Sequence, residues 1–143
     1  MKKAESLQAE LLGLVDKDAE AFEPLSRAYG IPKDDPDRAE IMEKALRDAC
    51  AVPMDIMRAA CKAIELQAEF AAKGSALAVS DAGVGVVFCK SALMGASLNV
   101  FINTKSMKDR DYALGLEKEA DELLDKYCAM ADDIYAAVVA KLR

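Results

Sequence analysis

Apolar residues recur every three or four positions along the first part of the chain, with charged residues between them. This spacing gathers the apolar side chains on one face, so residues 3–29 are predicted to form an amphipathic helix. Gly30 suits the position after its end and Pro32 cannot continue it, so residues 30–37 are expected to form a polar loop. Charge interrupts the apolar positions too often for a secretory signal peptide. The apolar positions are Leu7, Leu11, Leu14, Val15, Phe22, Leu25 and Tyr29.

The helical spacing resumes after this loop and continues to Lys73. Asp35 is a suitable N-cap because Pro36 follows it, and proline is well accommodated in the first helical position. The second helix is therefore predicted to begin at this pair of residues. Pro53 has no backbone N–H to donate within the helix, so we expect a kink or a break there.

A third helix is predicted over residues 80–103, where Ser80 can act as the N-cap and Asp81 would lie in the first turn. A fourth amphipathic helix is predicted over residues 110–142, with Asp109 as its N-cap. Short polar loops join the four segments. The pattern therefore predicts an all-α fold, an up-and-down bundle of long helices.

The third segment is apolar on every side, since Lys90 is the only charged residue between Asp81 and Lys105. The segment is long enough to span a membrane, which takes about 20 residues. Lys90 would then lie near the middle of the bilayer, at a cost of about 2.5–3.5 kcal/mol. A helix that is apolar all round is also typical of the centre of a soluble bundle or dimer. We favour this buried helix over a membrane span. Because it needs more neighbours than three other helices supply, we expect a dimer or larger homo-oligomer.

Composition narrows the class of protein further. The 143 residues suit a single domain over 1–143, with 53% hydrophobic and 31% charged residues. A net charge of −6 without a basic run argues against nucleic-acid binding. The absence of His removes histidine triads, bases and metal ligands, so acid–base chemistry must come from other side chains. The cysteines at positions 50, 61, 89 and 128 are interpreted as free thiols of a cytoplasmic protein.

Four short segments occur in the same order and at similar spacing in one protein family. They are LVDKDAEAF (14–22), GIPKD (30–34), VSDAGVG (79–85) and LNVFINTKSMKD (98–109). On these segments the chain resembles the cyclodeaminase domain of formiminotransferase-cyclodeaminase. It also resembles the stand-alone bacterial relatives called methenyltetrahydrofolate cyclohydrolases. The resemblance runs along the whole chain.

The resemblance implies an all-helical, homodimeric enzyme that acts on a one-carbon tetrahydrofolate without a metal or a redox cofactor. Cyclodeaminases close formiminotetrahydrofolate to methenyltetrahydrofolate with loss of ammonia, and the cyclohydrolases interconvert methenyl- and formyltetrahydrofolate. The family pattern also includes an earlier Ser-Pro-x-Pro-Gly-Gly-Gly-Ser loop, which these 143 residues lack. The rival hypothesis is therefore a non-catalytic helical oligomerisation or interaction module derived from that family.

Asp18 is the first candidate for the catalytic residue. It belongs to the Asp-Ala-Glu-Ala-Phe run that resembles the segment of the cyclodeaminase catalytic aspartate, and its helical neighbours are apolar. A carboxylate there can move a proton and stabilise the cationic centre of the folate. The plain alternative is a solvated residue beside Lys17 and Glu20. Asp16 is a competing candidate on the same helix.

The start of the third helix is a candidate substrate-binding region. Free N–H groups over residues 80–83 would suit an anionic part of the folate, with Gly83 allowing close approach and Ser80 and Asp81 beside it. Ordinary helix capping by Ser80 and Asp81 explains the same residues without any ligand.

Asn99 and Asn103 stand four residues apart on an otherwise apolar helix, so they share a face and could hydrogen-bond the pterin edge. A hydrogen bond across an oligomer interface is the alternative. Lys105 and Lys33 could meet the glutamate carboxylates of the folate. For each lysine, an ordinary solvated surface position is the alternative.

Overall fold

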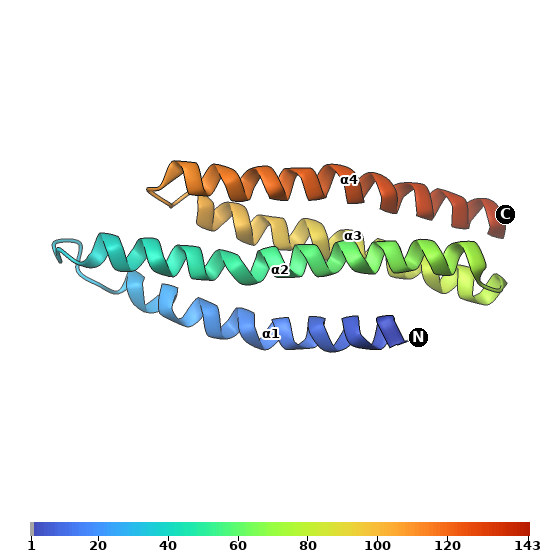
Figure 1. Cartoon of the computed structure of the whole chain (residues 1–143), viewed down its shortest axis with the longest axis horizontal. Helices are drawn as coiled ribbons and strands as arrows, with labels where there is room; N and C mark the ends of the chain where they lie inside the picture. The colour runs from blue at the N-terminus through green and yellow to red at the C-terminus, as the bar shows by residue number, and fades with distance from the viewer. Residues whose placement is uncertain (1) are drawn as a thin grey trace.

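The computed structural model describes residues 2–143, with Ala76 described by its backbone alone, and these residues form four long helices. They are α1 (Lys2–Tyr29), α2 (Arg38–Lys73), α3 (Ala76–Thr104) and α4 (Arg110–Leu142). The helices run alternately in opposite directions along one elongated body, as Figure 1 shows. The predicted all-α, up-and-down bundle is confirmed, and the predicted bounds of α4 are correct to the residue.

The prediction for the start of α2 was wrong by two residues. Asp37, not Asp35, is the N-cap, and Asp35 Oδ1 accepts a hydrogen bond from the backbone N–H of Asp37 at 2.9 Å. This short-range bond holds the chain in a turn before the helix begins. Pro53 does not break α2, which is continuous from Arg38 to Lys73. Its ring is buried among the neighbouring helices, so tertiary packing maintains the helix despite the missing hydrogen bond.

The predicted start of α3 was also wrong. Ser75, not Ser80, is the N-cap, and its Oγ accepts from the backbone N–H of Ala78 at 3.4 Å. The turn between α2 and α3 is so tight that a Cβ on Gly74 would lie 2.7 Å from the backbone oxygen of Phe70. The helix therefore begins directly after this glycine, and Asp81 lies in its second turn.

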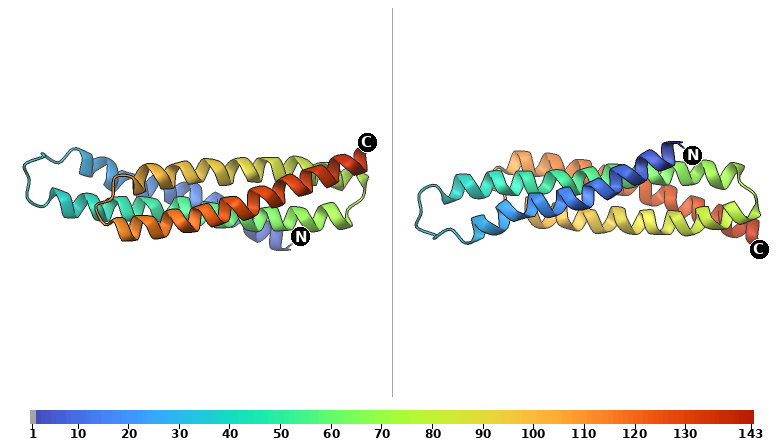
Figure 2. Two further views of the ribbon diagram at one scale, coloured as in Figure 1. Left: turned by 90° about the horizontal axis from the view of Figure 1, so that it is seen from above. Right: turned by 90° about the horizontal axis from the view of Figure 1, so that it is seen from below.

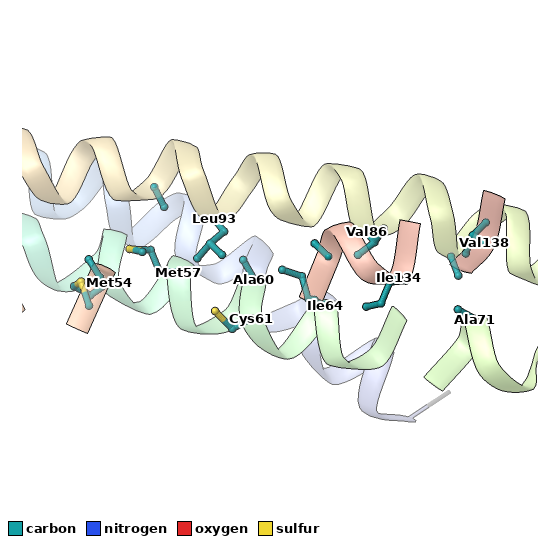
Figure 3. Close-up of a cluster of buried hydrophobic side chains, with 14 of the residues drawn as sticks. Met54, Met57, Ala60, Cys61, Ile64, Ala71, Val86, Leu93, Ile134 and Val138 are labelled. Carbon is teal, nitrogen blue, oxygen red and sulfur yellow. The ribbon is translucent and has the colours of Figure 1, made fainter. Parts of the chain in front are cut away.

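The packing of the four helices is uneven. Within residues 2–143, the backbone of α2 lies close to the other three helices, that of α3 lies close to α2 and α4, and that of α1 lies close to α2 alone. The largest core cluster lies where α2, α3 and α4 meet (Figure 3). It contains fully buried side chains from α2 and α3 and further ones from α4, among them Met57, Ile64, Val86, Leu93 and Val138.

Within the single chain the third helix is buried on one side only, which leaves untested the expectation that further neighbours cover it in an oligomer. One face of α3 packs on α2 and α4, but only 28% of its apolar window over Leu77–Thr104 is buried. Lys90, the charged residue within this window, forms an ion pair with α4, since its Nζ lies 2.7 Å from Asp132 Oδ1. By length and composition α3 could cross a membrane, a test that core helices of soluble proteins also pass.

Candidate functional site

A groove runs between α1 and α3 over the surface of α2. Figure 2 shows that α1 crosses α2 obliquely, so that its C-terminal half lies toward α3 and its N-terminal half on the other side of α2. Because the backbones of α1 and α3 do not approach each other closely, the groove remains open. Its cavity has a volume of about 320 Å³. The lining residues are Asp18, Phe22, Leu25, Tyr29, Ala49, Pro53, Asn99, Ile102 and Asn103.

Asp18 interrupts the apolar stripe by which α1 packs on α2. Leu14 and Leu25, on the same face of the helix, are buried, whereas Asp18 is half-buried and lines the cavity. The ion pairs formed among residues 2–143 do not include Asp18. A half-buried carboxylate with no such partner is available to a ligand that carries or develops positive charge. The sequence prediction that Asp18 lies along the buried face is confirmed.

Asn99 and Asn103 face the same cavity from α3, where they lie one helical turn apart. Asn99 is exposed and Asn103 is half-buried. Each side-chain amide offers donors and an acceptor. The groove therefore brings together three of the predicted site residues, an aspartate from one wall and two amides from the other.

Sequence reasoning missed the aromatic and aliphatic wall of the groove. Phe22, Tyr29 and Ile102 all line the cavity, and each is more than half exposed. They share the helical spacing of core residues, so the pattern assigned Phe22 and Tyr29 to the packed face of α1. The sequence did hold a signal for this wall, because the spacing of Asp18, Phe22 and Tyr29 puts all three on one face of the helix.

Pro53 and Ala49 form the part of the groove contributed by α2. Residue 53 would normally donate its N–H to the carbonyl of residue 49, and proline has none to donate. The Ala49 carbonyl therefore lacks its usual helical donor.

The remaining substrate-binding candidates lie elsewhere. Ser80 and Gly83 line a different hollow between α3 and the end of α4, and Asp81 is exposed. Asp81 and Asn99 are separated by about 27 Å along the helix, at 1.5 Å per residue. The prediction of free N–H groups over residues 80–83 was wrong because the helix begins at Ala76. A Cβ on Gly83 would lie 2.8 Å from Val138 Cγ1, so this glycine lets α4 approach closely.

The other charged candidates do not line the groove. Lys105 is exposed just beyond the end of α3, and Asp16 and Lys33 are exposed on α1 and in the following loop. Asp18 is therefore the ionisable carboxylate of the cavity.

The thiols are poorly suited to nucleophilic chemistry. All four cysteines are free, as predicted, and Cys50 and Cys61 are buried. Burial raises the pKa of Cys50 to about 11 and is the main cause that raises the pKa of Cys61 to about 12. Because the thiolate is the reactive form, these groups are inert near neutral pH. Within the described residues no cluster of three or more Cys, Asp or Glu side chains could hold a metal ion.

The comparisons with known proteins agree with one another. A sequence profile of the family described as formiminotransferase-cyclodeaminase matches residues 1–122. The chain is 36% identical to methenyltetrahydrofolate cyclohydrolase of Methylorubrum extorquens, over 99% of this chain and 70% of that protein. It is 32% identical to formimidoyltransferase-cyclodeaminase of Sus scrofa, over 82% of this chain and 23% of that protein.

A solved structure is also similar to this chain. The crystal structure of formiminotetrahydrofolate cyclodeaminase from Thermotoga maritima superposes with a TM-score of 0.76 at 27% identity, covering 96% of this chain and 64% of that one. The chain therefore spans about two thirds of this solved protein.

Proposed function

Because the chain belongs to the formiminotransferase-cyclodeaminase family, we propose that its groove binds a tetrahydrofolate carrying a one-carbon unit. The reaction opens or closes the five-membered ring that joins N5 and N10 of the folate through that carbon. The observation that carries the proposal is Asp18, a half-buried carboxylate that faces a cavity walled by two amides and two aromatic rings.

The lining of the cavity suits the pterin end of a folate. Phe22 and Tyr29 offer apolar ring surface, and Asn99 and Asn103 offer hydrogen-bond donors and acceptors. A volume of about 320 Å³ lies at the lower end of the about 300–1,000 Å³ typical of small-molecule sites. The groove therefore holds the pterin and its one-carbon unit, and the aminobenzoyl-glutamate part extends along the surface.

Asp18 supplies proton transfer and charge stabilisation in this proposal. In ring opening, water adds to the methenyl carbon and Asp18 accepts its proton. Asp18 then returns this proton to N5 as the carbon–N5 bond breaks, and the hydroxyl proton leaves to solvent as the formyl C=O forms. In the deaminating direction, N10 attacks the carbon of the protonated formimino group, and Asp18 passes the proton of N10 to the amino group, which leaves as ammonia. The negative carboxylate also stabilises the methenyl cation that both routes share. Neither route changes the oxidation level of the carbon, so neither calls for a redox cofactor.

The test is hydrolysis of methenyltetrahydrofolate by the purified chain, followed by near-ultraviolet absorbance, with Asp18→Asn beside it. We expect the substitution to lower kcat by about 10²–10⁴-fold, the usual contribution of general acid–base catalysis. Asp16→Asn is the matched control, because Asp16 is exposed on the same helix and does not line the groove. Unchanged turnover in Asp18→Asn, or equal losses in both variants, would contradict the role of Asp18.

A second candidate function rests on the exposed apolar face of α3. A non-catalytic interaction module derived from the same family would need this face and would not need the groove. A folded wild-type chain that neither turns over nor binds a one-carbon tetrahydrofolate would favour the module. In either case, a soluble location in the cytoplasm is part of the proposal.

A further inference from the structure

The two side-chain amides that face the groove make no hydrogen bond to another part of residues 2–143. The side-chain hydrogen bonds formed within this range involve neither Asn99 nor Asn103. Asn103 is half-buried and Asn99 is exposed, although both line the cavity. Both amides are therefore free to bind a ligand, and they meet it at different depths.

The level of Asp18 along the bundle follows from a contact between α1 and α2. Glu10 Oε1 of α1 lies 3.7 Å from Lys62 Nζ of α2. Because these helices run in opposite directions (Figure 1), each step forward along α1 from Glu10 corresponds to a step backward along α2 from Lys62. Asp18 is therefore level with Met54, the neighbour of Pro53, which lines the cavity.

A contact between α2 and α3 carries this level to the opposite wall of the groove. Cys50 Sγ of α2 lies 3.6 Å from the carbonyl oxygen of Val100 on α3, and these two helices also run in opposite directions (Figure 1). The level of Asp18 then falls at about residue 96 of α3. At 1.5 Å per residue, Asn99 is displaced from that level by about 4.5 Å along the helix axis and Asn103 by about 10 Å. Asn99 is therefore the amide that stands opposite Asp18.

The groove consequently has two ends with different chemistry. α1 and α3 run in the same direction (Figure 1), so Tyr29 and Asn103 lie together toward the C-terminal ends of both helices. At the other end the walls carry Asp18 and Asn99, and α2 contributes the ring of Pro53, which has no N–H. A water molecule at this second end therefore meets one polar side chain on each wall and an apolar floor.

Ring opening requires a water molecule that is held in one orientation. In the proposed function Asp18 accepts one proton of this water, which leaves a second O–H bond to be satisfied. The side-chain oxygen of Asn99 is an acceptor on the facing wall. With both O–H bonds engaged, a lone pair of the water oxygen points at the carbon between N5 and N10, and such orientation contributes strongly to the rate.

The same hydrogen bond serves the later steps of ring opening. The new C–O bond gives a tetrahedral carbon whose hydroxyl group still donates to Asn99. As the carbon–N5 bond breaks, its electron pair stays on N5, which receives the proton held by Asp18. The hydroxyl proton then leaves to solvent past the exposed Asn99 side chain, and the oxygen becomes the formyl C=O.

Asn103 suits a different task. Its amide offers donors and an acceptor beside Tyr29, at the end of the groove away from Asp18. The edge of a pterin ring carries donors and acceptors side by side, which such an amide can pair. Because Asn103 is half-buried, a ligand that leaves its amide unpaired is disfavoured, and this gives recognition rather than rate.

We propose that the two asparagines of α3 have separate tasks: Asn99 holds the attacking water opposite Asp18, and Asn103 recognises the pterin. This inference rests on the proposed function. It also orients the folate, with the pterin toward the C-terminal ends of α1 and α3 and the one-carbon unit between Asp18 and Asn99.

The test compares Asn99→Leu and Asn103→Leu in steady-state hydrolysis of methenyltetrahydrofolate. Leucine resembles asparagine in shape but cannot form the hydrogen bonds. We expect Asn99→Leu to lower kcat by about 10²-fold with little change in KM, the loss typical of a misplaced reactant. We expect Asn103→Leu to raise KM about tenfold with little change in kcat, the loss of one hydrogen bond. Each variant is the matched control of the other, because the change is the same and the two positions are one turn apart.

A double-mutant cycle tests whether Asn99 and Asp18 act on the same water. In the Asp18→Asn background the water is no longer activated, so we expect Asn99→Leu to lower kcat far less than in the wild-type chain. The rate without protein is subtracted throughout. An equal fold-loss in both backgrounds would show that Asn99 acts independently of Asp18, and would overturn its assignment. Asn99→Ala, which adds no apolar surface and favours the helix, should behave like Asn99→Leu.

The remaining outcomes separate this inference from the proposed function. Higher KM without a loss of kcat in both variants would show that both amides bind the pterin, and wild-type kinetics in both would show that neither contacts the substrate. Either result in a chain that turns over would overturn the division of tasks and leave the proposed function in place. A wild-type chain without turnover would count against the proposed function itself, and the inference would fall with it.

Discussion

At the scale of single residues, Asp18 shows how a candidate site residue can be recognised in the sequence while its surroundings cannot. A carboxylate within a run of apolar positions on one helix face is unusual, and together with the family resemblance it made Asp18 the first candidate; the structure places Asp18 in the lining of the groove. Phe22 and Tyr29 carry no anomaly, because aromatic residues at helical spacing usually belong to the core. They are exposed because the backbones of α1 and α3 lie apart, and that separation depends on tertiary structure.

The aromatic wall gives a test on binding. Phe22→Ala removes ring surface from the cavity, and we expect KM for methenyltetrahydrofolate to rise about tenfold, equivalent to about 1.4 kcal/mol, with a smaller effect on kcat. Leu12→Ala is the matched control, because Leu12 is also an exposed apolar residue of α1 but does not line the groove. Similar KM values for the two variants would show that Phe22 does not contact the substrate.

Replacing two different glycines by alanine is expected to change the free energy of unfolding in opposite directions. Gly83→Ala forces a Cβ against Val138 Cγ1 at 2.8 Å, so we expect a loss of about 1–3 kcal/mol in the free energy of unfolding. Gly115→Ala adds a Cβ in open space and improves helix propensity, so we expect a gain of about 0.5–1 kcal/mol. Urea unfolding measures both. A stabilising Gly83→Ala would mean that α4 does not lie as close to α3 as described.

At the scale of elements, the ends of the helices were predictable where a single local rule decides them. Asp109 caps α4 as expected, its Oδ1 accepting from the backbone N–H of Tyr112 at 3.1 Å. Ser80 satisfies the same local rule, but the prediction that it caps α3 was wrong. The tight turn at Gly74 places the N-cap at Ser75 instead. Sequence offers two acceptable serines there, and only the packing of α2 against α3 selects between them.

The start of α4 is also held by a residue far away in sequence. Glu43 on α2 accepts hydrogen bonds from the backbone N–H groups of Lys108 and Asp109, at 2.8 and 3.1 Å. We expect Glu43→Ala to lower the free energy of unfolding by about 1–3 kcal/mol, since both donors lose a charged acceptor. Glu40→Ala, an exposed position near the same end of α2, should change it by no more than about 0.5 kcal/mol. Urea denaturation of both variants measures the difference, and equal values would assign no stabilising role to the two hydrogen bonds.

At the scale of the whole molecule, several groups favour their protonated forms in the folded state. The hydrogen bond from Tyr127 to Glu65, at 2.6 Å, is the main cause that raises the pKa of Tyr127 from 10.0 to about 12. Burial raises the pKa of Cys50 from 9.0 to about 11. The unfolded chain therefore releases these protons at lower pH than the folded protein does. Stability from these groups is complete below about pH 9 and declines as pH rises toward about 12.

Thermal unfolding between pH 7 and pH 11 tests this sign. We expect a Tm that is steady up to about pH 9 and falls above it. Tyr127→Phe should have a lower Tm at pH 7, because the hydrogen bond is lost, and a shallower decline above about pH 10. A Tm that rises with alkaline pH would contradict the direction of these pKa shifts.

The bundle as a whole was predictable from periodicity, and the groove was not. Four amphipathic or apolar segments joined by short loops leave few arrangements other than an up-and-down bundle. The sequence does not indicate that α1 packs on one neighbour instead of two, since its apolar stripe looks like that of any bundle helix. The sequence did indicate that the three other helices would not cover all of α3, and one face of this apolar helix is indeed exposed in the single chain.

The single contact of α1 has a consequence for local unfolding. A helix held by one neighbour opens at a lower free energy than helices enclosed by several, so its backbone amides should exchange hydrogen for deuterium soonest among the four. The same helix carries Asp18 and the aromatic wall of the groove. A ligand that bridges α1 and α3 would give α1 its second neighbour. Folate binding is therefore expected to slow amide exchange in the C-terminal half of α1 more than anywhere else in the chain.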